Sequence, residues 1–290
     1  MVEDSLSKWR AAPAARGLLW ANEVDGSLDV RRFLPSEDLA PFIHHFGSAH
    51  WDLRSPLAVD TLPHPAGRIE LDVTRGVCRA EVVGLRTGRF GNCRTGRGQF
   101  FVAQFRAATL QPLLGAAMSS LTDRAVPVAS VLGPRADAWV SALCRARSPE
   151  AELELTEAFL REVIPVLPPP VAAMRDLVER IGADSTVCRV QRVAELASLD
   201  MRTLQRRFRK YVGAHPKWVI QRYRLQEAAQ QLRAATPVAL SRLAADLGYA
   251  DQAHFARDFR RVMGHPPGHF TRTAGPYDLG AMKSPARSRA

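Results

Sequence analysis

The sequence predicts an α+β protein with two domains: a β-rich first domain with appended helices, and an all-α second domain. Three observations support this division. The chain has 290 residues, enough for about two domains. Four of the six residues from Pro165 to Pro170 are prolines, which favours a stiff, extended linker. Apolar residues repeat at strand spacing before this linker and at helical spacing after it.

This pattern divides the chain into five parts. We expect an N-terminal extension at 1–27, a first domain at 28–164, the linker at 165–170, a helical domain at 171–274 and a disordered basic tail at 275–290. No apolar stretch reaches the length of a membrane span, and the N-terminus has no apolar segment of the kind found in signal peptides. The sequence therefore indicates a cytoplasmic protein without a membrane partner.

The first domain begins with short alternating or apolar runs separated by glycines, which predict strands. The clearest runs lie at 69–73, 80–85 and 99–105. The apolar period then becomes helical. It predicts helices at 110–121, 136–147 and 150–163.

Histidines and acids in the first domain raise the alternative of an enzyme. The candidate metal ligands are His44, His45, His50, His64, Asp52, Asp60 and Glu70. A cupin-type metal site needs an H-x-H pair followed closely by a glutamate, and this spacing does not occur. The four cysteines form neither a C-x-x-C pair nor the cluster that a DNA-repair methyltransferase would need, so we expect reduced thiols. We expect no metal, cofactor or enzyme activity, and keep a DNA-binding domain fused to a metal-dependent or other enzyme as the alternative.

The excess positive charge lies in the second domain. The whole chain has a formal net charge of +11. The segment from Val171 onward contains 21 Lys and Arg residues and 10 Asp and Glu residues, whereas the first 170 residues contain 19 basic and 19 acidic residues. This asymmetry is typical of a domain that neutralises DNA phosphates, although a basic surface can also serve an anionic membrane or solubility.

The second domain contains an internal repeat. Phe208, Gly213 and Pro216 recur 51 residues later as Phe259, Gly264 and Pro267, and 193–199 matches 243–249. The domain reads as helices nearly throughout. They are predicted at 171–181, 189–197, 201–211, 216–234, 239–247, 252–262 and 267–271.

Each copy of the repeat has the plan of a helix-turn-helix. Four features follow one another in the same order in both copies: a small residue where the helices cross, a turn residue, an apolar residue that fills the crossing, and an acidic N-cap. They are Ala194, Ser198, Leu199 and Asp200 in the first copy, and Ala244, Gly248, Tyr249 and Asp251 in the second. The i, i+4 pairs Leu204–Phe208 and Phe255–Phe259 should then face the core, which leaves the opposite face for DNA.

Basic and amide side chains occupy that opposite face in both copies. Arginine and glutamine pair well with guanine and adenine edges in the major groove. The predicted base contacts are Arg202, Gln205, Arg206, Gln252, His254 and Arg257. The predicted phosphate contacts are Arg207, Arg209, Lys210, Arg260 and Arg261. A solvated basic face is the alternative, but the same face occurs twice in register, which favours DNA.

These motifs resemble the DNA-binding domain of the AraC/XylS family of bacterial regulators over about a hundred residues. The matching segments are Leu204-Gln205-Arg206-Arg207-Phe208, Gly213-x-x-Pro216, Arg224-Leu225 with Ala228, Leu243-Ala244-x-x-Leu247-Gly248-Tyr249, and Asp251-Gln252-Ala253-His254-Phe255-x-Arg257-x-Phe259. Ser198 and Met201 depart from the family pattern. The resemblance implies a transcriptional regulator, with RNA polymerase and a second copy of the chain among its partners.

The first domain looks like the sensory half of some family members, which implies a cupin-like barrel for effector binding or dimerisation. Apolar and aromatic residues inside such a barrel would line a small-molecule pocket. The candidates are Trp51, Arg68, Phe100, Phe101 and Phe105.

Overall fold

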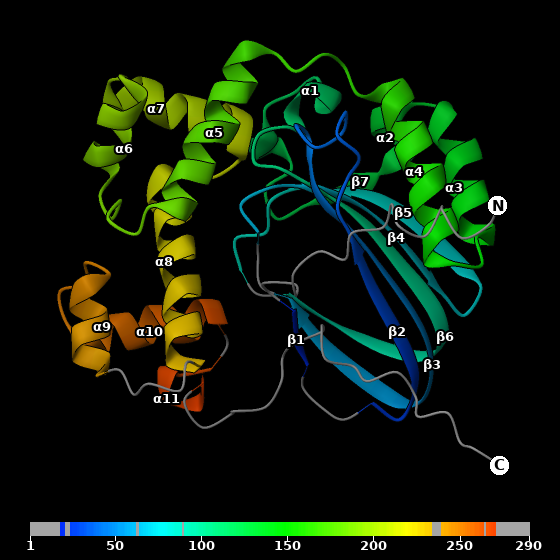
Figure 1. Ribbon diagram of the computed structural model, residues 1–290, viewed down its shortest axis with the longest axis horizontal. Coiled ribbons are helices and arrows are strands. Elements are labelled where there is room, and N and C mark those ends of the chain that lie inside the picture. Colours follow the sequence, from blue (N-terminus) through cyan, green and yellow to red (C-terminus); the bar gives the residue numbers. More distant parts are fainter. Residues whose placement is uncertain are drawn as a thin grey trace.

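A computed structural model describes residues 18–20, 24–61, 64–88, 90–233, 239–263 and 265–270. A strand-rich first domain and a helical second domain lie side by side, and the chain crosses between them after α4 (Pro149–Val163) (Figure 1). This arrangement confirms the α+β class. Most of the predicted extension and all of the predicted basic tail lie outside the described residues.

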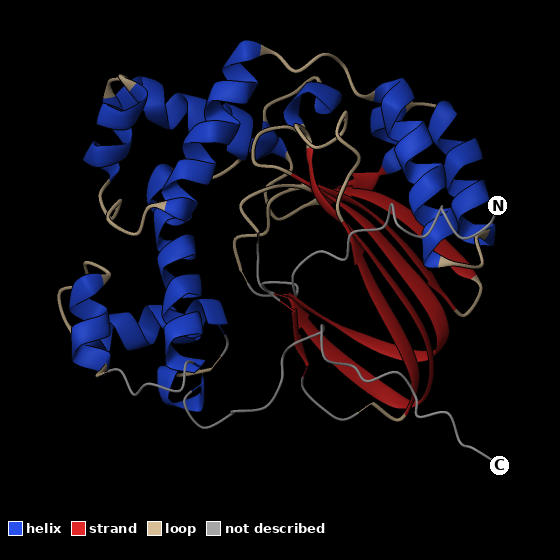
Figure 2. Cartoon of the chain, viewed as in Figure 1, coloured by secondary structure: helices blue, strands red, loops and turns tan. Residues whose placement is uncertain are grey.

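The strands form one antiparallel sheet in the order β1-β3-β6-β4-β5-β7, with β2 also paired to β3. Their bounds are β1 (Leu18–Trp20), β2 (Gly26–Phe33), β3 (Ile43–Thr61), β4 (Arg68–Thr74), β5 (Val77–Val83), β6 (Phe90–Phe105) and β7 (Ala125–Pro127). β1 and the start of β2 fall within the stretch predicted as an extension, so the sheet begins before residue 28. Among the described strands no pairing joins β7 back to β1 or β2, and the sheet is curved and open there (Figure 2).

The two long strands β3 and β6 form the centre of the sheet, yet the sequence pattern predicts only the end of β6. Their pairing is irregular at two places, between Ile43 and His45 and between Leu53 and Leu57. The second irregularity contains Pro56, which has no N–H for the ladder. Bulges interrupt the two-residue alternation by which strands are recognised. This explains why a 19-residue strand was not predicted.

Helices cover one face of this sheet. They are α1 (Gln111–Leu114), the 3-10 helix η2 (Met118–Ser120), α2 (Val128–Leu132), α3 (Arg135–Arg145) and α4. The helices predicted at 136–147 and 150–163 are confirmed within two residues at each end. The helix predicted at 110–121 is wrong as a single element: Gly115 adopts a φ of 62° and ends α1 after one turn.

A buried polar network fixes α4 to the sheet. The carboxylate of Glu152 is fully buried and accepts a hydrogen bond from Ser48 Oγ at 2.5 Å. Its other oxygen lies 2.9 Å from His50 Nε2. This hydrogen bond and the carboxylate charge raise the pKa of His50 above its ordinary value of 6.5.

The His50 contact predicts a pH dependence of stability. A histidine with a raised folded-state pKa stabilises the fold fully below the unfolded pKa, and this contribution is lost as the pH rises through the folded value. Glutamine keeps a donor but does not titrate, so the difference in unfolding free energy between the wild type and His50→Gln should shrink from about pH 6 to about pH 8. Urea denaturation across this range measures it. A difference that does not change with pH would contradict the assignment.

The sulfur atoms of Cys78 and Cys144 form a disulfide, which corrects the expectation of four reduced thiols. Cys78 lies at the start of β5 and Cys144 in the last turn of α3. The two residues are 66 positions apart in the sequence, and only the packing of α3 on the sheet brings them together. Cys93 and Cys188 are free thiols.

The second domain matches the predicted helices closely. They are α5 (Pro169–Ala183), α6 (Val190–Ala197), α7 (Met201–Arg207), the π-helix η3 (Phe208–Val212), α8 (Pro216–Arg233), α9 (Leu240–Asp246), α10 (Gln252–Met263) and α11 (Pro267–Phe270). The predicted linker at 165–170 is shorter than expected, because Pro169 and Pro170 form the first turn of α5. Proline fits there, since the first N–H groups of a helix have no intrahelical acceptor.

Two hydrophobic clusters build the second domain, and both use α8. Val219 and Ile220 of α8 belong to the cluster around α5, α6 and α7. Leu225 and Leu232 belong to the cluster around α9 and α10. The helix therefore joins two separately packed units.

Candidate nucleic-acid interface

The two units share one hydrogen-bonding pattern at their turns. In the first unit, Leu199 N donates to Ala194 O at 3.0 Å. In the second, Tyr249 N donates to Ala244 O at 2.9 Å, fifty residues later. The repeat found in the sequence is therefore a repeat of local structure.

Ser198 and Gly248 end the first helix of each unit in the left-handed region. Their φ values are 51° and 76°. Glycine adopts this conformation without strain, whereas serine does so at a cost because its Cβ crowds the backbone. The structure thus confirms the predicted turn at Ser198, although this residue is not a glycine.

The second helix of each unit, α7 or α10, is called its recognition helix below. Both recognition helices begin with the predicted aspartate cap. Asp200 Oδ1 accepts from Thr203 N at 2.9 Å, and Asp251 Oδ1 accepts from His254 N at 2.7 Å. The backbone hydrogen bond from Thr203 lowers the pKa of Asp200. Each cap satisfies a backbone donor that the first turn leaves open, and so fixes where the helix begins.

The core-facing pairs are placed as predicted. Leu204, Phe208, Phe255 and Phe259 are fully buried. The side chains predicted to contact DNA face outward on both helices. Arg202, Gln205, Arg206, Arg209, Lys210, Gln252, His254, Arg257, Arg260 and Arg261 are exposed, and Arg207 is half-buried.

In the second recognition helix, α10, Asp258 pairs with two of the side chains predicted to contact DNA. Its carboxylate lies 3.0 Å from Arg261 Nη2 and 3.7 Å from His254 Nε2. It also accepts a long hydrogen bond of 3.4 Å from Gln221 of α8. By contrast, neither Arg206 nor Arg257 has an ion pair or side-chain hydrogen bond within the described residues, so both guanidinium groups are available to a ligand.

The first recognition helix ends differently from the second. After Arg207 the helix widens into η3, and Gly213 N donates to Phe208 O at 2.9 Å across five residues. The prediction of one regular helix at 201–211 did not include this change. α10 continues as an α-helix to Met263. A π-turn of this kind is uncommon and is often found at functional positions.

The predicted effector residues lie on two faces of the sheet. Trp51 and Phe100 pack together on the face opposite the helices, with the Arg94 guanidinium about 5 Å from both rings. Arg68 is directed to the same face by strand alternation and pairs with Glu70 at 2.6 Å. Phe101 and Phe105 belong to the core beneath α3 and α4. The structure therefore places three of the five on one face, and of these it brings only Trp51 and Phe100 into contact.

The candidate metal ligands do not gather into one site. His44 contacts both His45 and His64, with ring centroids 5.2 and 5.1 Å apart. His50 instead contacts Glu152, and Glu70 pairs with Arg68. Asp52 is exposed, and the side chain of Asp60 lies outside the described part. Across the described ranges, no three His, Cys, Asp or Glu side chains are grouped to hold a metal ion.

Residues 193–273 match the family model of a helix-turn-helix domain. A protein of Streptomyces lividans described as an AraC-like transcription regulator is 35% identical over 78 residues, which cover 27% of this chain and 25% of the relative. A crystal structure of an AraC family transcriptional regulator from Rhodopseudomonas palustris is 30% identical, covers 36% of this chain and 98% of its own, and gives a TM-score of 0.32.

The second domain of this chain is an AraC-type helix-turn-helix domain. The AraC-type domain comprises both units built above, and its family match begins at Val193 in α6. The chain spans about a quarter of the length of the curated relative it matches.

The first domain has separate matches. Residues 31–127 match a domain of unknown function (DUF6597). ToxT from Vibrio cholerae, in a structure with a bound unsaturated fatty acid, aligns with 90% of this chain and 96% of its own at 12% identity and a TM-score of 0.36. These values are too low to transfer a ligand to the first domain. Within the residues that the structure describes, no helix is both long and apolar enough to span a bilayer.

Proposed function

We propose that the full chain is a sequence-specific transcription regulator that binds double-stranded DNA and places one recognition helix in each of two adjacent major grooves. One observation carries the proposal: the same turn, cap and exposed basic face occur at both ends of α8. This helix has 18 residues, about 27 Å at 1.5 Å per residue. The spacing suits two grooves about 34 Å apart on one side of the duplex.

We assign the two helix faces to different parts of the DNA. The side chains on the first two turns of α7 and α10 would read base edges, because the N-terminal part of a recognition helix enters the groove most deeply. They are Arg202, Gln205, Arg206, Gln252, His254 and Arg257. The remaining side chains would hold phosphates and set the register of the protein on the duplex. They are Arg207, Arg209, Lys210, Arg260 and Arg261.

The first domain would supply regulation in this proposal. A small-molecule effector would bind on the face of the sheet opposite the helices, where Phe100 packs on the buried Trp51 and Arg68 supplies charge. The sheet and its helices would also provide the contacts for a homodimer, and DNA-bound protein would act on RNA polymerase. This role places the protein in the cytoplasm, and it leaves the first domain as a sensor rather than an enzyme.

Binding of the full chain to duplex DNA tests the proposal. Duplexes selected from a random pool by the full chain provide the probe, and fluorescence anisotropy gives the affinity as a function of salt. The logarithm of the binding constant should fall linearly with the logarithm of salt concentration, by about 0.9 per phosphate contact. Footprinting should show two protected segments about 10 base pairs apart.

Two results would contradict DNA binding of this form: an affinity independent of salt for every duplex, or one protected segment only. Arg260→Ala tests the assignment of this residue to a phosphate. Loss of this phosphate contact should weaken binding to all sequences alike and reduce the salt slope by about 1.

A further inference from the structure

Among the described residues, the first domain contributes to the hydrophobic core of the first helix-turn-helix unit and not to that of the second. Leu85, Ala107 and Ala108 belong to the first domain, and each is at most 3% exposed. They pack in the same hydrophobic cluster as Phe208 and Val212 of η3. The cluster of the second unit, within the described residues, is formed by α8, α9, α10 and the turn between α9 and α10.

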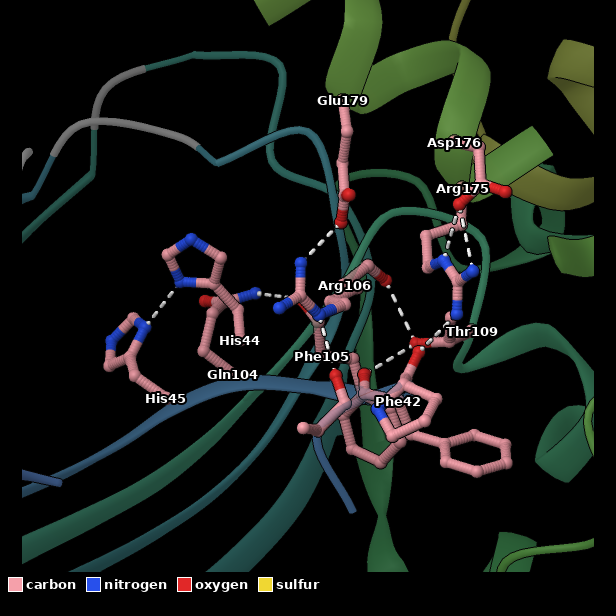
Figure 3. Close-up of polar contacts among 12 residues, drawn as sticks. Phe42, His44, His45, Gln104, Phe105, Arg106, Thr109, Arg175, Asp176 and Glu179 are labelled. Atoms are coloured by element: carbon pink, nitrogen blue, oxygen red, sulfur yellow. Dashed lines mark hydrogen bonds and ion pairs between the residues drawn. The ribbon is translucent and has the colours of Figure 1, made fainter. Parts of the chain in front are cut away.

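Several polar contacts of described residues join the first domain to the same unit. Arg106 Nη1 pairs with Glu179 of α5 at 2.5 Å, and Arg175 of α5 donates to Pro41 O at 3.0 Å. Figure 3 shows Arg106 and Glu179 facing each other, with Arg175 on the neighbouring turn of α5. At the start of α8, Trp218 Nε1 donates to Thr87 O at 3.3 Å. Each of these contacts fixes an element of the first unit.

One contact reaches the end of the recognition helix itself. Thr122 Oγ1 donates to Gly213 O at 2.6 Å. Gly213 has a φ of 89°, and a Cβ at this position would lie 3.0 Å from Thr122 Oγ1 and 3.1 Å from Met118 O. The first domain therefore lies directly against the residue that terminates η3. Because η3 continues α7, this contact sets the position of the exposed face that carries Arg206.

We propose that the first domain controls DNA binding through the first helix-turn-helix unit alone, by holding the end of its recognition helix at Gly213. The inference rests on the proposed DNA-binding function. The second unit, attached through α8, acts as the constant anchor on DNA. A change in the first domain shifts or loosens α7 and η3, and so alters the reading of one half-site while the other is kept.

Thr122→Val in the full chain tests the proposal, because valine is similar in shape to threonine but lacks the hydroxyl donor. Thr122→Ser keeps the donor and is the matched control. The probe is the duplex selected by the wild-type chain, used intact and with either half-site scrambled. Thr122→Val should reduce the contribution of the first unit's half-site by about two- to tenfold, the range expected for one hydrogen bond. The contribution of the second half-site should change less than twofold, and Thr122→Ser should resemble the wild type.

Amide hydrogen exchange of the free protein supplies a second measurement that does not need DNA. In Thr122→Val, exchange should become faster in α7 and η3 and stay unchanged in α10. Hydrogen exchange separates this inference from the proposed DNA-binding function. It tests whether the first domain holds α7 and η3 even if the wild type binds no duplex. Equal changes in both units, a change confined to α10, or no change in α7 and η3 would overturn the inference.

Discussion

Replacing Arg206 or Arg257 with alanine will weaken binding to the selected duplex by about 1 to 3 kcal/mol each, while binding to a scrambled duplex falls much less. Both guanidinium groups are exposed on recognition helices, and a bidentate arginine–guanine pair is worth this amount of discrimination. The two residues lie in separately packed units, so the double variant should lose about 2 to 6 kcal/mol. Titrations of full-length variants against both duplexes at one salt concentration measure the effect.

Arg192→Ala is the control for these variants. Arg192 lies on α6, outside the recognition helices, and pairs at 3.0 Å with Glu195. Removing it should leave the preference between the two duplexes unchanged. If Arg206→Ala or Arg257→Ala weakens both duplexes equally, that arginine contacts only phosphate and its assignment as a base reader is wrong.

Arg224→Ala will have the largest effect on stability, a loss of about 3 to 5 kcal/mol in the free energy of unfolding. The side chain of Arg224 is 2% exposed and pairs with Glu227 at 2.7 Å. Its Nη2 atom donates to Ile181 O and, at 3.0 Å, to Asp184 O. These carbonyls lie at the end of α5, where a helix leaves acceptors unsatisfied, so the guanidinium caps α5 from α8.

Urea denaturation of the full chain measures this loss, followed by helical circular dichroism. Arg192→Ala again provides the comparison, because its exposed i, i+3 ion pair should contribute less than about 1 kcal/mol. A change below about 1 kcal/mol for Arg224→Ala would show that solvent replaces the buried arginine at the end of α5.

The helical domain could be predicted closely because its signals are local. A helix is defined by residues three and four apart, and a cap or a turn by neighbours within three positions. Asp200, Ser198 and their counterparts in the second unit therefore took the predicted conformations. The π-turn at η3 is an exception, since it occurs where Gly213 meets the first domain.

The first domain was predicted less well because its partners are distant in sequence. Irregularities in β3 break the alternation, and the helix-covered face cannot be distinguished from the open face by apolar residues alone. Phe100 and Phe101 illustrate this, since adjacent residues of one strand point to opposite faces. For the same reason Phe101 and Phe105 lie on the helix-covered face, whereas Trp51 lies on the opposite face.

The sequence by itself determined that the chain contains two helix-turn-helix units, where each begins, and which basic side chains face outward. Each of those features depends on contacts within about ten residues. Only the tertiary structure decided that Cys78 meets Cys144 and that Glu152 is buried against His50. It also decided that the described part of the first domain packs into the core of the first unit. These contacts join segments dozens of residues apart, and their meeting is set by the packing of whole elements.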